Sequence, residues 1–429
     1  MDKTSQRKES DSDEGKISRR DFLKYVGATG ALLGMSALPI TKIFGDITNT
    51  TNNSVQSSNT SSSSFHSSVH VFHLDSTTPQ FSNSAGSQTI AASNNFPILA
   101  GWGMATFLIR LKENGVLEPH WHPNSAELSY CIKGRARMTL FPSNTDADSF
   151  TVNTFTVEPG ELVFVPQGFM HNIENISNEE AKFIIAHSNE QPTTIGISGS
   201  VGSMPNRVMN KTFGINPPNT FFNGFNNNST NDIITGLKKT TPFTTNNNNN
   251  NTPKSGINIP NMPNSYKFNV EGIPPQIQTP GGTVAKANTN SFPILNGSNL
   301  SLFTLIVKPN GVREPHWHPN ASELGYVLDG LARLIVLNPG GTVDTFEVGP
   351  GDIYFVPKGF FHYIENLDSN KNMHFAIFFG SDTPGDIGIS GSLSAYSNEV
   401  LSAVFNLDSS YFNKLPRVSQ DVLVVSGGG

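Results

Sequence analysis

Apolar and polar residues alternate along the chain in many short runs, which Gly and Pro turns separate. Alternation with a period of two predicts strands that bury one face, and many such runs at short spacing favour a sandwich or a barrel. The runs fall into two regions, and each region closes with a more helical stretch, at 205–213 and at 397–405. The predicted fold class is therefore all-β, with short helices after each region. The predicted strands are 105–111, 128–132, 135–141, 162–165 and 182–186, and then 302–307, 324–328, 332–337, 353–356 and 374–379.

The two regions are copies of each other. A shift of 196 residues places 118–137 on 314–333 with thirteen of twenty positions identical. The first copy has five extra residues within 142–149, after which the register resumes at a shift of 191. So long a period with only two copies indicates tandem domains rather than a solenoid. We expect domain 1 at 69–209 and domain 2 at 266–420.

Segments rich in Asn, Ser and Thr lie before and between the copies. They contain too few apolar residues to offset the entropy that ordering would cost. We therefore predict a tether at 46–68 and a mobile linker at 210–265. A short tail at 421–429 follows the second copy.

Residues 1–45 resemble a bacterial twin-arginine export signal. A Ser-Arg-Arg-Asp-Phe-Leu-Lys motif at 18–24 precedes a weakly apolar, glycine-containing run over 25–40. An amphipathic or buried helix that happens to follow two arginines is the alternative. The resemblance implies that the twin-arginine machinery transports the folded protein, which would be periplasmic or secreted. The poor cleavage site leaves open whether the signal is removed or stays as an anchor.

Composition argues against several classes of function. A net charge of −6 and a pI near 6.0 give no basic footprint for nucleic acid. No apolar run reaches the roughly 18 residues that a membrane span requires. The single cysteine, Cys131, excludes an intrachain disulfide and is most simply a small core residue.

Each copy carries three histidines and one glutamate at matching positions. Residues two apart on a strand point to the same face, so both histidines of a His-Trp-His run enter the interior together. A glutamate on the adjacent strand and a histidine after a Pro-x-Gly turn can reach the same centre. Histidines held by hydrogen bonds within a core are the alternative. The predicted metal ligands are His120, His122, Glu127 and His171 in the first copy, and His316, His318, Glu323 and His362 in the second.

Three imidazoles and one carboxylate, with room for two further ligands, suit octahedral Mn2+ or Fe2+. Zinc accepts these ligand types but prefers four-coordinate sites. Affinity alone would favour copper or zinc, whereas folding in a metal-buffered cytoplasm before export favours manganese. We predict two Mn2+ sites, one per copy, with Fe2+ or Zn2+ as weaker alternatives.

The spacing around these ligands resembles the two motifs of the cupin family. The first is Glu-x6-Gly from Glu127, and the second is Gly-x5-Pro-x-Gly-x2-His-x3-Asn, which ends at Asn175. The second copy repeats both motifs. Each copy departs from the family pattern at one point: four residues, not five, separate the preceding glycine (Gly115 or Gly311) from the first histidine. The duplicated EPHWHPN is similar to bicupin oxalate decarboxylases, and the segments that end each copy resemble germins. The resemblance implies two tandem jelly-roll (double-stranded β-helix) barrels in a homo-oligomer, a trimer or hexamer.

For oxalate decarboxylases the resemblance implies that oxalate, a small dicarboxylate, becomes formate and CO2 at manganese. It also implies an arginine near the first histidine that pairs with the substrate's free carboxylate. Arg313 has this place in the second copy, where the first copy has Leu117, so we expect the second site to be the reactive one. A surface salt bridge is the alternative role for Arg313.

The family's decarboxylating loop also carries a proton donor in a Ser-Glu-Asn sequence, which neither copy contains. Glu190 in the first copy and Asp382 or Asp386 in the second are the candidate donors, because a carboxyl desolvated near a metal can have a raised pKa. Solvated loop acids are the alternative. The other functions left open are a non-catalytic manganese-binding or storage protein of the periplasm, and a germin-like oxalate oxidase or superoxide dismutase.

Overall fold

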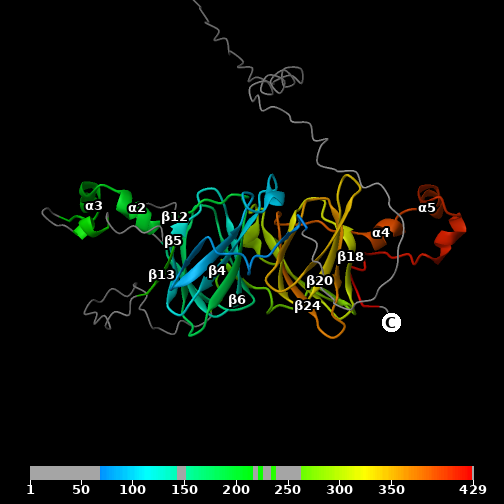
Figure 1. The fold of residues 1–429 in the computed structure, drawn as a ribbon, viewed down its shortest axis with the longest axis horizontal. Helices are drawn as coiled ribbons and strands as arrows, with labels where there is room; N and C mark the ends of the chain where they lie inside the picture. The colour runs from blue at the N-terminus through cyan, green and yellow to red at the C-terminus, as the bar shows by residue number, and fades with distance from the viewer. Residues whose placement is uncertain (1–67, 143–150, 216–220, 226–232, 238–261, 428–429) are drawn as a thin grey trace, which may run out of the picture. The chain divides into compact units, whose positions relative to one another are not determined.

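The computed structural model describes residues 68–142, 151–215, 221–225, 233–237 and 262–427 (Figure 1). The predicted export signal, almost all of the predicted tether and most of the 210–265 segment lie outside these residues. Within the described ranges, no helix is long and apolar enough to cross a membrane.

The first copy consists of two antiparallel sheets, which confirms the all-β prediction. The strands of its six-stranded sheet are β5 (Gly115–Trp121), β7 (Ala136–Phe141), β8 (Asn153–Val157), β10 (Met170–Asn175), β12 (Ile195–Gly196) and β13 (Ile234–Gly236). Those of its seven-stranded sheet are β2 (Phe81–Asn83), β3 (Gly86–Ala91), β4 (Ala105–Leu111), β6 (Glu127–Lys133), β9 (Glu161–Val165), β11 (Ala181–His187) and β14 (Lys267–Asn269). The strand orders are β12-β5-β10-β7-β8, with β13 also on β5, and β14-β9-β6-β11-β4-β3-β2.

The second copy repeats this topology. Its six-stranded sheet contains β18 (Val312–Trp317), β20 (Ala332–Leu337), β21 (Val343–Val348), β23 (Phe361–Asn366), β25 (Ile387–Gly388) and β26 (Val424–Val425). Its seven-stranded sheet contains β1 (Val71–Phe72), β15 (Ile277–Thr279), β16 (Gly282–Ala287), β17 (Ser301–Val307), β19 (Glu323–Asp329), β22 (Ile353–Val356) and β24 (Met373–Phe379). The orders are β21-β20-β23-β18-β25, with β26 on β18, and β1-β22-β19-β24-β17-β16-β15.

Short helices follow each copy, as the two helical stretches predict. In the second copy, the Ser397 side chain accepts a hydrogen bond from the Val400 amide and so caps the start of α5. Asn406 ends that helix in the left-handed conformation. The α-helices are α2 (Ile197–Ser203), α3 (Asn206–Thr212), α4 (Ile389–Ser394) and α5 (Asn398–Phe405). The short 3-10 helices are η1 (Pro97–Leu99), η2 (Phe221–Gly224), η3 (Pro293–Leu295) and η4 (Ser409–Lys414).

Three apolar clusters hold the sheets together. One fills the interior of each copy, between its two sheets. The third lies between the copies and includes Leu128 and Tyr130 from the first and Leu324 and Tyr326 from the second. The inner strands of the seven-stranded sheets, such as β9 and β22, are therefore buried on both faces. This explains why β9 reads as a continuous apolar run after its first residue rather than as an alternation.

The two copies also exchange strands. β1 precedes the first copy in the sequence but pairs with β22 of the second, with Phe72 opposite Ile353. β14 precedes the second copy but pairs with β9 of the first, with Phe268 opposite Leu162. Each copy thus covers an edge of the other's sheet. The strand that precedes each domain in the sequence therefore belongs to the sheet of the other domain.

Two segments expected to lie outside the domains contribute strands. β13 comes from the predicted linker and pairs with β5, and β26 comes from the predicted tail and pairs with β18. Ile234 and Val424 are almost fully buried there. The prediction of a mobile linker is wrong at β13, and the predicted tail is part of domain 2 at β26. Each segment supplies an apolar residue and backbone partners to a strand that carries metal ligands.

Candidate metal centres

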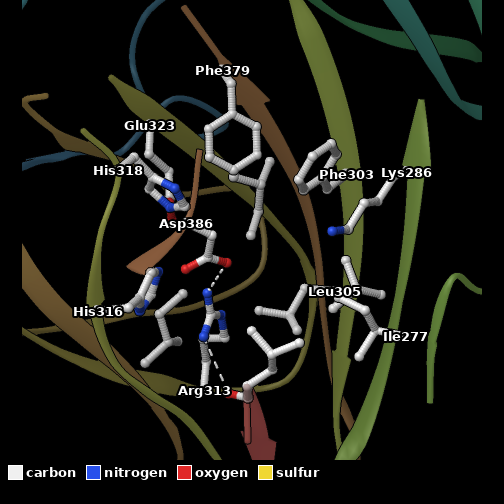
Figure 2. A pocket seen from close by; sticks show the side chains of 14 residues that line it. Ile277, Lys286, Phe303, Leu305, Arg313, His316, His318, Glu323, Phe379 and Asp386 are labelled. Carbon is white, nitrogen blue, oxygen red and sulfur yellow. Dashed lines mark hydrogen bonds and ion pairs between the residues drawn. The ribbon is translucent and has the colours of Figure 1, made fainter. Parts of the chain in front are cut away.

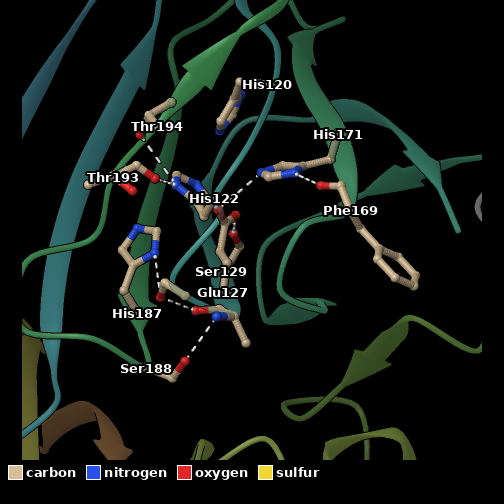
Figure 3. A network of polar contacts seen from close by, with 12 residues as sticks. His120, His122, Glu127, Ser129, Phe169, His171, His187, Ser188, Thr193 and Thr194 are labelled. Atoms are coloured by element: carbon tan, nitrogen blue, oxygen red, sulfur yellow. Dashed lines mark hydrogen bonds and ion pairs between the residues drawn. The ribbon is translucent and has the colours of Figure 1, made fainter. Parts of the chain in front are cut away.

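The first copy brings its four predicted ligands to one buried centre (Figure 3). His120 on β5 lies opposite His171 on β10 in the antiparallel register. His122 directly follows β5, and Glu127 begins β6. The ligand atoms all lie within 4.8 Å of one another.

Backbone carbonyls select the tautomer of each imidazole in this centre. Nδ1 of each ring lies at hydrogen-bond distance from a carbonyl oxygen, so Nδ1 carries the proton and Nε2 keeps its lone pair. The accepting carbonyls and the Nδ1–O distances are Glu118 for His120 (2.7 Å), Thr193 for His122 (2.9 Å) and Phe169 for His171 (2.9 Å).

The second copy builds the same centre from His316, His318, Glu323 and His362. His316 on β18 lies opposite His362 on β23. The accepting carbonyls are Glu314 for His316 (2.7 Å), Gly385 for His318 (2.7 Å) and Phe360 for His362 (2.9 Å).

The close contacts between imidazole nitrogens and the glutamate carboxylate are favourable only with a cation between them. Oε2 of Glu127 lies 3.1 Å from Nε2 of both His122 and His171. Oε2 of Glu323 lies 2.9 Å from Nε2 of His318 and 3.3 Å from Nε2 of His362. With the protons on Nδ1, these atoms present lone pairs to one another, an arrangement that a proton or a metal ion between them stabilises. The donor set therefore fits a divalent metal.

Electrostatics keep these groups in forms that bind metal. Burial alone would raise the pKa of Glu127, but the charge of His171 and the close contact with His122 hold it well below its usual range. The pKa of His120 lies well below its usual range, mainly because the ring is buried and also because His171 and His122 are close to it. Burial would lower the pKa of His171, but the Glu127 carboxylate raises it. The centre thus combines an ionised carboxylate with a preference for one added positive charge.

A different residue orients the glutamate in each copy. In the first copy, the Ser129 hydroxyl donates to Oε1 of Glu127 over 2.5 Å. In the second, Gly325 replaces this serine, and the Tyr354 hydroxyl donates to Oε1 of Glu323 over 2.5 Å. A Cβ at Gly325 would lie 2.1 Å from the Tyr354 ring, so the glycine is what admits the tyrosine. Both solutions hold the carboxylate in place from its second oxygen.

A cavity of about 30 Å³ opens beside the metal ligands of the second copy (Figure 2). It exceeds the ~10–15 Å³ that one water needs, so it suits a small ligand. Its walls are mostly apolar, whereas Arg313, Asp386 and Lys286 contribute charge. The apolar part comprises Ile277, Val284, Phe303, Leu305, Ile364, Ile377, Phe379 and Leu423.

Arg313 lies in this cavity and not on the surface. Its side chain is 7% exposed, and Nη2 pairs with Oδ2 of Asp386, whose side chain is 28% exposed. Nη1 donates to the Leu423 carbonyl over 3.2 Å. The C-terminal segment therefore helps to orient the guanidinium toward the cavity.

Comparison with known proteins identifies the architecture. The family described as Cupin matches residues 72–220 and 268–411, which is one match for each copy. The chain belongs to the cupin family. Each copy is one cupin domain, and the two domains form a bicupin.

Curated relatives extend across both domains. The chain is 26% identical over 320 residues to a probable oxalate decarboxylase of Arthroderma benhamiae, covering 73% of this chain and 74% of that protein. It is 26% identical to oxalate decarboxylase OxdC of Bacillus subtilis, covering 75% and 78%. A germin-like protein of Arabidopsis thaliana matches at 30% over 38% of this chain and 74% of that protein. A solved structure of the B. subtilis enzyme aligns with a TM-score of 0.68 at 23% identity, over 85% and 91% of the chains, which shows a shared fold.

Two of the three candidate proton donors accept hydrogen bonds from backbone amides in nearby turns. In cupin domain 1, Oε2 of Glu190 accepts hydrogen bonds from the amides of Gly101 (2.6 Å) and Gly103 (3.2 Å). In cupin domain 2, Oδ2 of Asp382 accepts from the Gly297 amide over 2.6 Å. Both carboxylates cap the turns that follow η1 and η3, and Asp382 does not line the cavity. The predicted catalytic role of Asp382 and Glu190 is not supported, whereas the third candidate, Asp386, does line the cavity.

Cupin domain 1 differs from domain 2 around its metal ligands. Leu117 stands in place of Arg313, and Thr194 stands in place of Asp386. A fourth histidine, His187, stands where domain 2 has Phe379; it is fully buried, and its ring centre lies 4.7 Å from that of His122. The sequence analysis missed His187, Lys286 and Tyr354. Aligning the two copies would have pointed to them as polar residues opposite apolar ones.

Proposed function

We propose that this protein is an exported, manganese-dependent bicupin that converts oxalate to formate and CO2 at the centre in cupin domain 2. The observation that carries the proposal is Arg313, a buried guanidinium that lines one cavity together with His316, His318 and Glu323. Curated oxalate decarboxylases at 25–26% identity over about three quarters of the chain support it.

Manganese is the metal that fits this role. Three imidazole nitrogens and one carboxylate leave open positions for a small ligand in an octahedral sphere. One solved structure of B. subtilis oxalate decarboxylase is described by its Mn(II) centres. When bound, such a metal supplies Lewis acidity and redox chemistry to a coordinated carboxylate.

The residues of domain 2 would then perform three tasks. Arg313 binds and orients a substrate carboxylate by charge-assisted hydrogen bonds. The apolar wall, which includes Phe303 and Phe379, limits the access of water and strengthens those bonds. Asp386, which pairs with Arg313 as a carboxylate, would take up a proton when a substrate carboxylate takes its place on the guanidinium. It would then pass this proton to the carbon that keeps the electron pair when the C–C bond breaks, so that CO2 leaves and formate remains.

The first centre would serve metal binding without oxalate turnover. Leu117 offers no charge to a substrate carboxylate, although all four ligands are in place. A metal at this centre stabilises the folded domain, because it binds the folded chain and not the unfolded one.

Export and assembly complete the proposal. The 18–24 motif directs the folded protein to the twin-arginine machinery, and the mature protein is periplasmic or secreted. The helices after each domain leave apolar side chains exposed, among them Phe213 at 63%, Val404 at 70% and Tyr411 at 60%. Exposed apolar side chains on the helical segment of each domain are typical of an interface, which favours the trimer or hexamer of the expected homo-oligomer.

The test uses the full-length protein purified from its own host. Metal content is measured by mass spectrometry, and the same sample is assayed for formate and CO2 from oxalate. Manganese with formate supports the proposal. Manganese with peroxide indicates an oxalate oxidase, and manganese with no product indicates a metal-binding or storage protein, or a superoxide dismutase if superoxide is consumed. Zinc or copper in both centres would refute the redox chemistry.

Export is tested separately by cell fractionation of a variant with Arg19→Lys and Arg20→Lys.

A further inference from the structure

Lys286 extends into the cavity of domain 2 from the wall opposite His316 and His318 (Figure 2). It lies on β16, and its Nζ is 5.1 Å from the centre of the Phe303 ring. Within the described part of the chain, this cation–π contact is the interaction of the Lys286 ammonium, which forms no hydrogen bond or ion pair there. A half-buried ammonium without a carboxylate partner is unusual and favours an anionic ligand.

The charges around the cavity do not balance. Glu323 also lines the cavity, but its carboxylate belongs to the metal centre. Of the other charged groups, Lys286 and Arg313 each contribute one positive charge, and Asp386 contributes one negative charge that Arg313 already pairs. Burial lowers the pKa of Lys286, and the nearby Arg313 adds to this effect against the opposing charge of Asp386. An anion in the cavity would remove the excess of positive charge.

The fold does not require a lysine at this position. In domain 1 the equivalent residue of β3 is Ile90, which lies opposite Phe107 as Lys286 lies opposite Phe303. Ile90 and Leu117 together remove both cations from the corresponding region of domain 1. Both domains fold with the same topology. The lysine is therefore not needed for packing, and its role in domain 2 is to bind a ligand.

We propose that Lys286 is a specificity-determining residue, whose ammonium supplies the second positive charge that makes this cavity select dicarboxylate dianions over monocarboxylates. The inference rests on the proposed function in taking a small dicarboxylate as the substrate. Arg313 pairs with one carboxylate, and Lys286 attracts the charge of the other across a cavity with a low dielectric constant.

The test measures binding of two ligands of nearly the same shape to the Mn2+-loaded full-length protein. Oxalate carries two negative charges, and oxamate, in which an amide replaces one carboxylate, carries one. Isothermal titration compares the wild-type protein with Lys286→Met, which keeps the stem on Phe303, and with Lys286→Arg, which keeps the charge. Lys308→Met is the matched control, because it removes one positive charge from an exposed lysine of the same domain.

We expect Lys286→Met to weaken oxalate binding about 10-fold, which is the factor that 1.4 kcal/mol gives, and to change oxamate binding less than about twofold. Lys286→Arg should restore most of the oxalate affinity, and Lys308→Met should leave both ligands unaffected. In turnover, Lys286→Met should raise KM for oxalate with little change in kcat. Equal losses for oxalate and oxamate, or no loss in Lys286→Met, would overturn the inference. Manganese content and thermal unfolding exclude a folding defect.

The two proposals fail in different ways. Charge-dependent binding of oxalate without formate would refute the decarboxylase activity and leave the role of Lys286 standing. Formate production with unchanged oxalate affinity in Lys286→Met would do the reverse.

Discussion

Replacing Arg313 by leucine gives domain 2 the residue that domain 1 already carries at this place. The substitution Arg313→Leu removes the guanidinium from the cavity while its neighbours His316 and Glu323 keep their own hydrogen bonds. It separates the role of the arginine from that of the metal centre, which domain 1 builds with Leu117.

The expected loss of activity follows from the contacts that the guanidinium makes. Its side chain is 7% exposed, so a hydrogen bond from it to a substrate carboxylate is charge-assisted and well shielded from water. Such bonds contribute about 1.5–3 kcal/mol, which corresponds to a fall in kcat/KM of about 10- to 150-fold. The variant also leaves Asp386 without its partner, and we expect a further loss of stability of about 1–3 kcal/mol.

The assay compares formate release from oxalate by wild type, Arg313→Leu and Arg137→Leu, all loaded with manganese to the same content. Arg137 forms a similarly buried pair with Glu174 in domain 1, with side chains 9% and 14% exposed. Arg137→Leu should therefore lower the free energy of unfolding by a similar amount without affecting turnover in domain 2. Equal kcat/KM for wild type and Arg313→Leu, or an equal loss in both variants, would refute the assignment of Arg313 to the substrate.

Three other predictions test the remaining assignments. Tyr354→Phe removes the hydrogen bond to Glu323, so manganese affinity at one of two sites should fall about 10- to 100-fold in equilibrium dialysis, and unchanged binding would contradict the role of the tyrosine. The asparagine of Asp382→Asn can still accept the hydrogen bond from the Gly297 amide, so kcat should stay within about twofold of wild type. A much larger fall in kcat would indicate that Asp382 takes part in catalysis. Burial would raise the pKa of Glu271, but the hydrogen bond and charge of His374 lower it below the ordinary 4.5, so its contribution to stability is present above about pH 4.5 and is lost as the pH falls through the folded-state pKa. The difference in urea unfolding between Glu271→Gln and wild type should therefore shrink as the pH falls below about 4.5, and a constant difference across pH would refute this.

Local patterns were enough to predict the repeated unit and its metal ligands. Residues two apart on a strand must share a face, so the His-Trp-His run places two imidazoles together in any sheet. The glutamate and the third histidine follow turns whose Pro and Gly residues return the chain to the same centre. Recurrence of the whole set in two diverged copies distinguished it from chance.

The acids of the loops could not be assigned in the same way. Glu190, Asp382 and Asp386 all follow the last long strand of a copy, and spacing alone ranks none of them first. The structure separates them because Asp382 and Glu190 meet free amides of the η3 and η1 turns, whereas Asp386 meets Arg313. These partners lie 73 or more residues away in sequence, so no local sequence pattern predicts the contacts.

By itself, then, the sequence determined the all-β class, the duplication and the eight ligands, because these depend on the period of a strand and on turns of a few residues. Only the tertiary structure decided the exchange of β1 and β14 between the domains, the replacement of Ser129 by Tyr354 as partner of the glutamate, and the meeting of Arg313 with Lys286 in one cavity. Each of these joins residues that are far apart in the chain. Their contact depends on how whole sheets pack and on which side chain fills the space that another leaves.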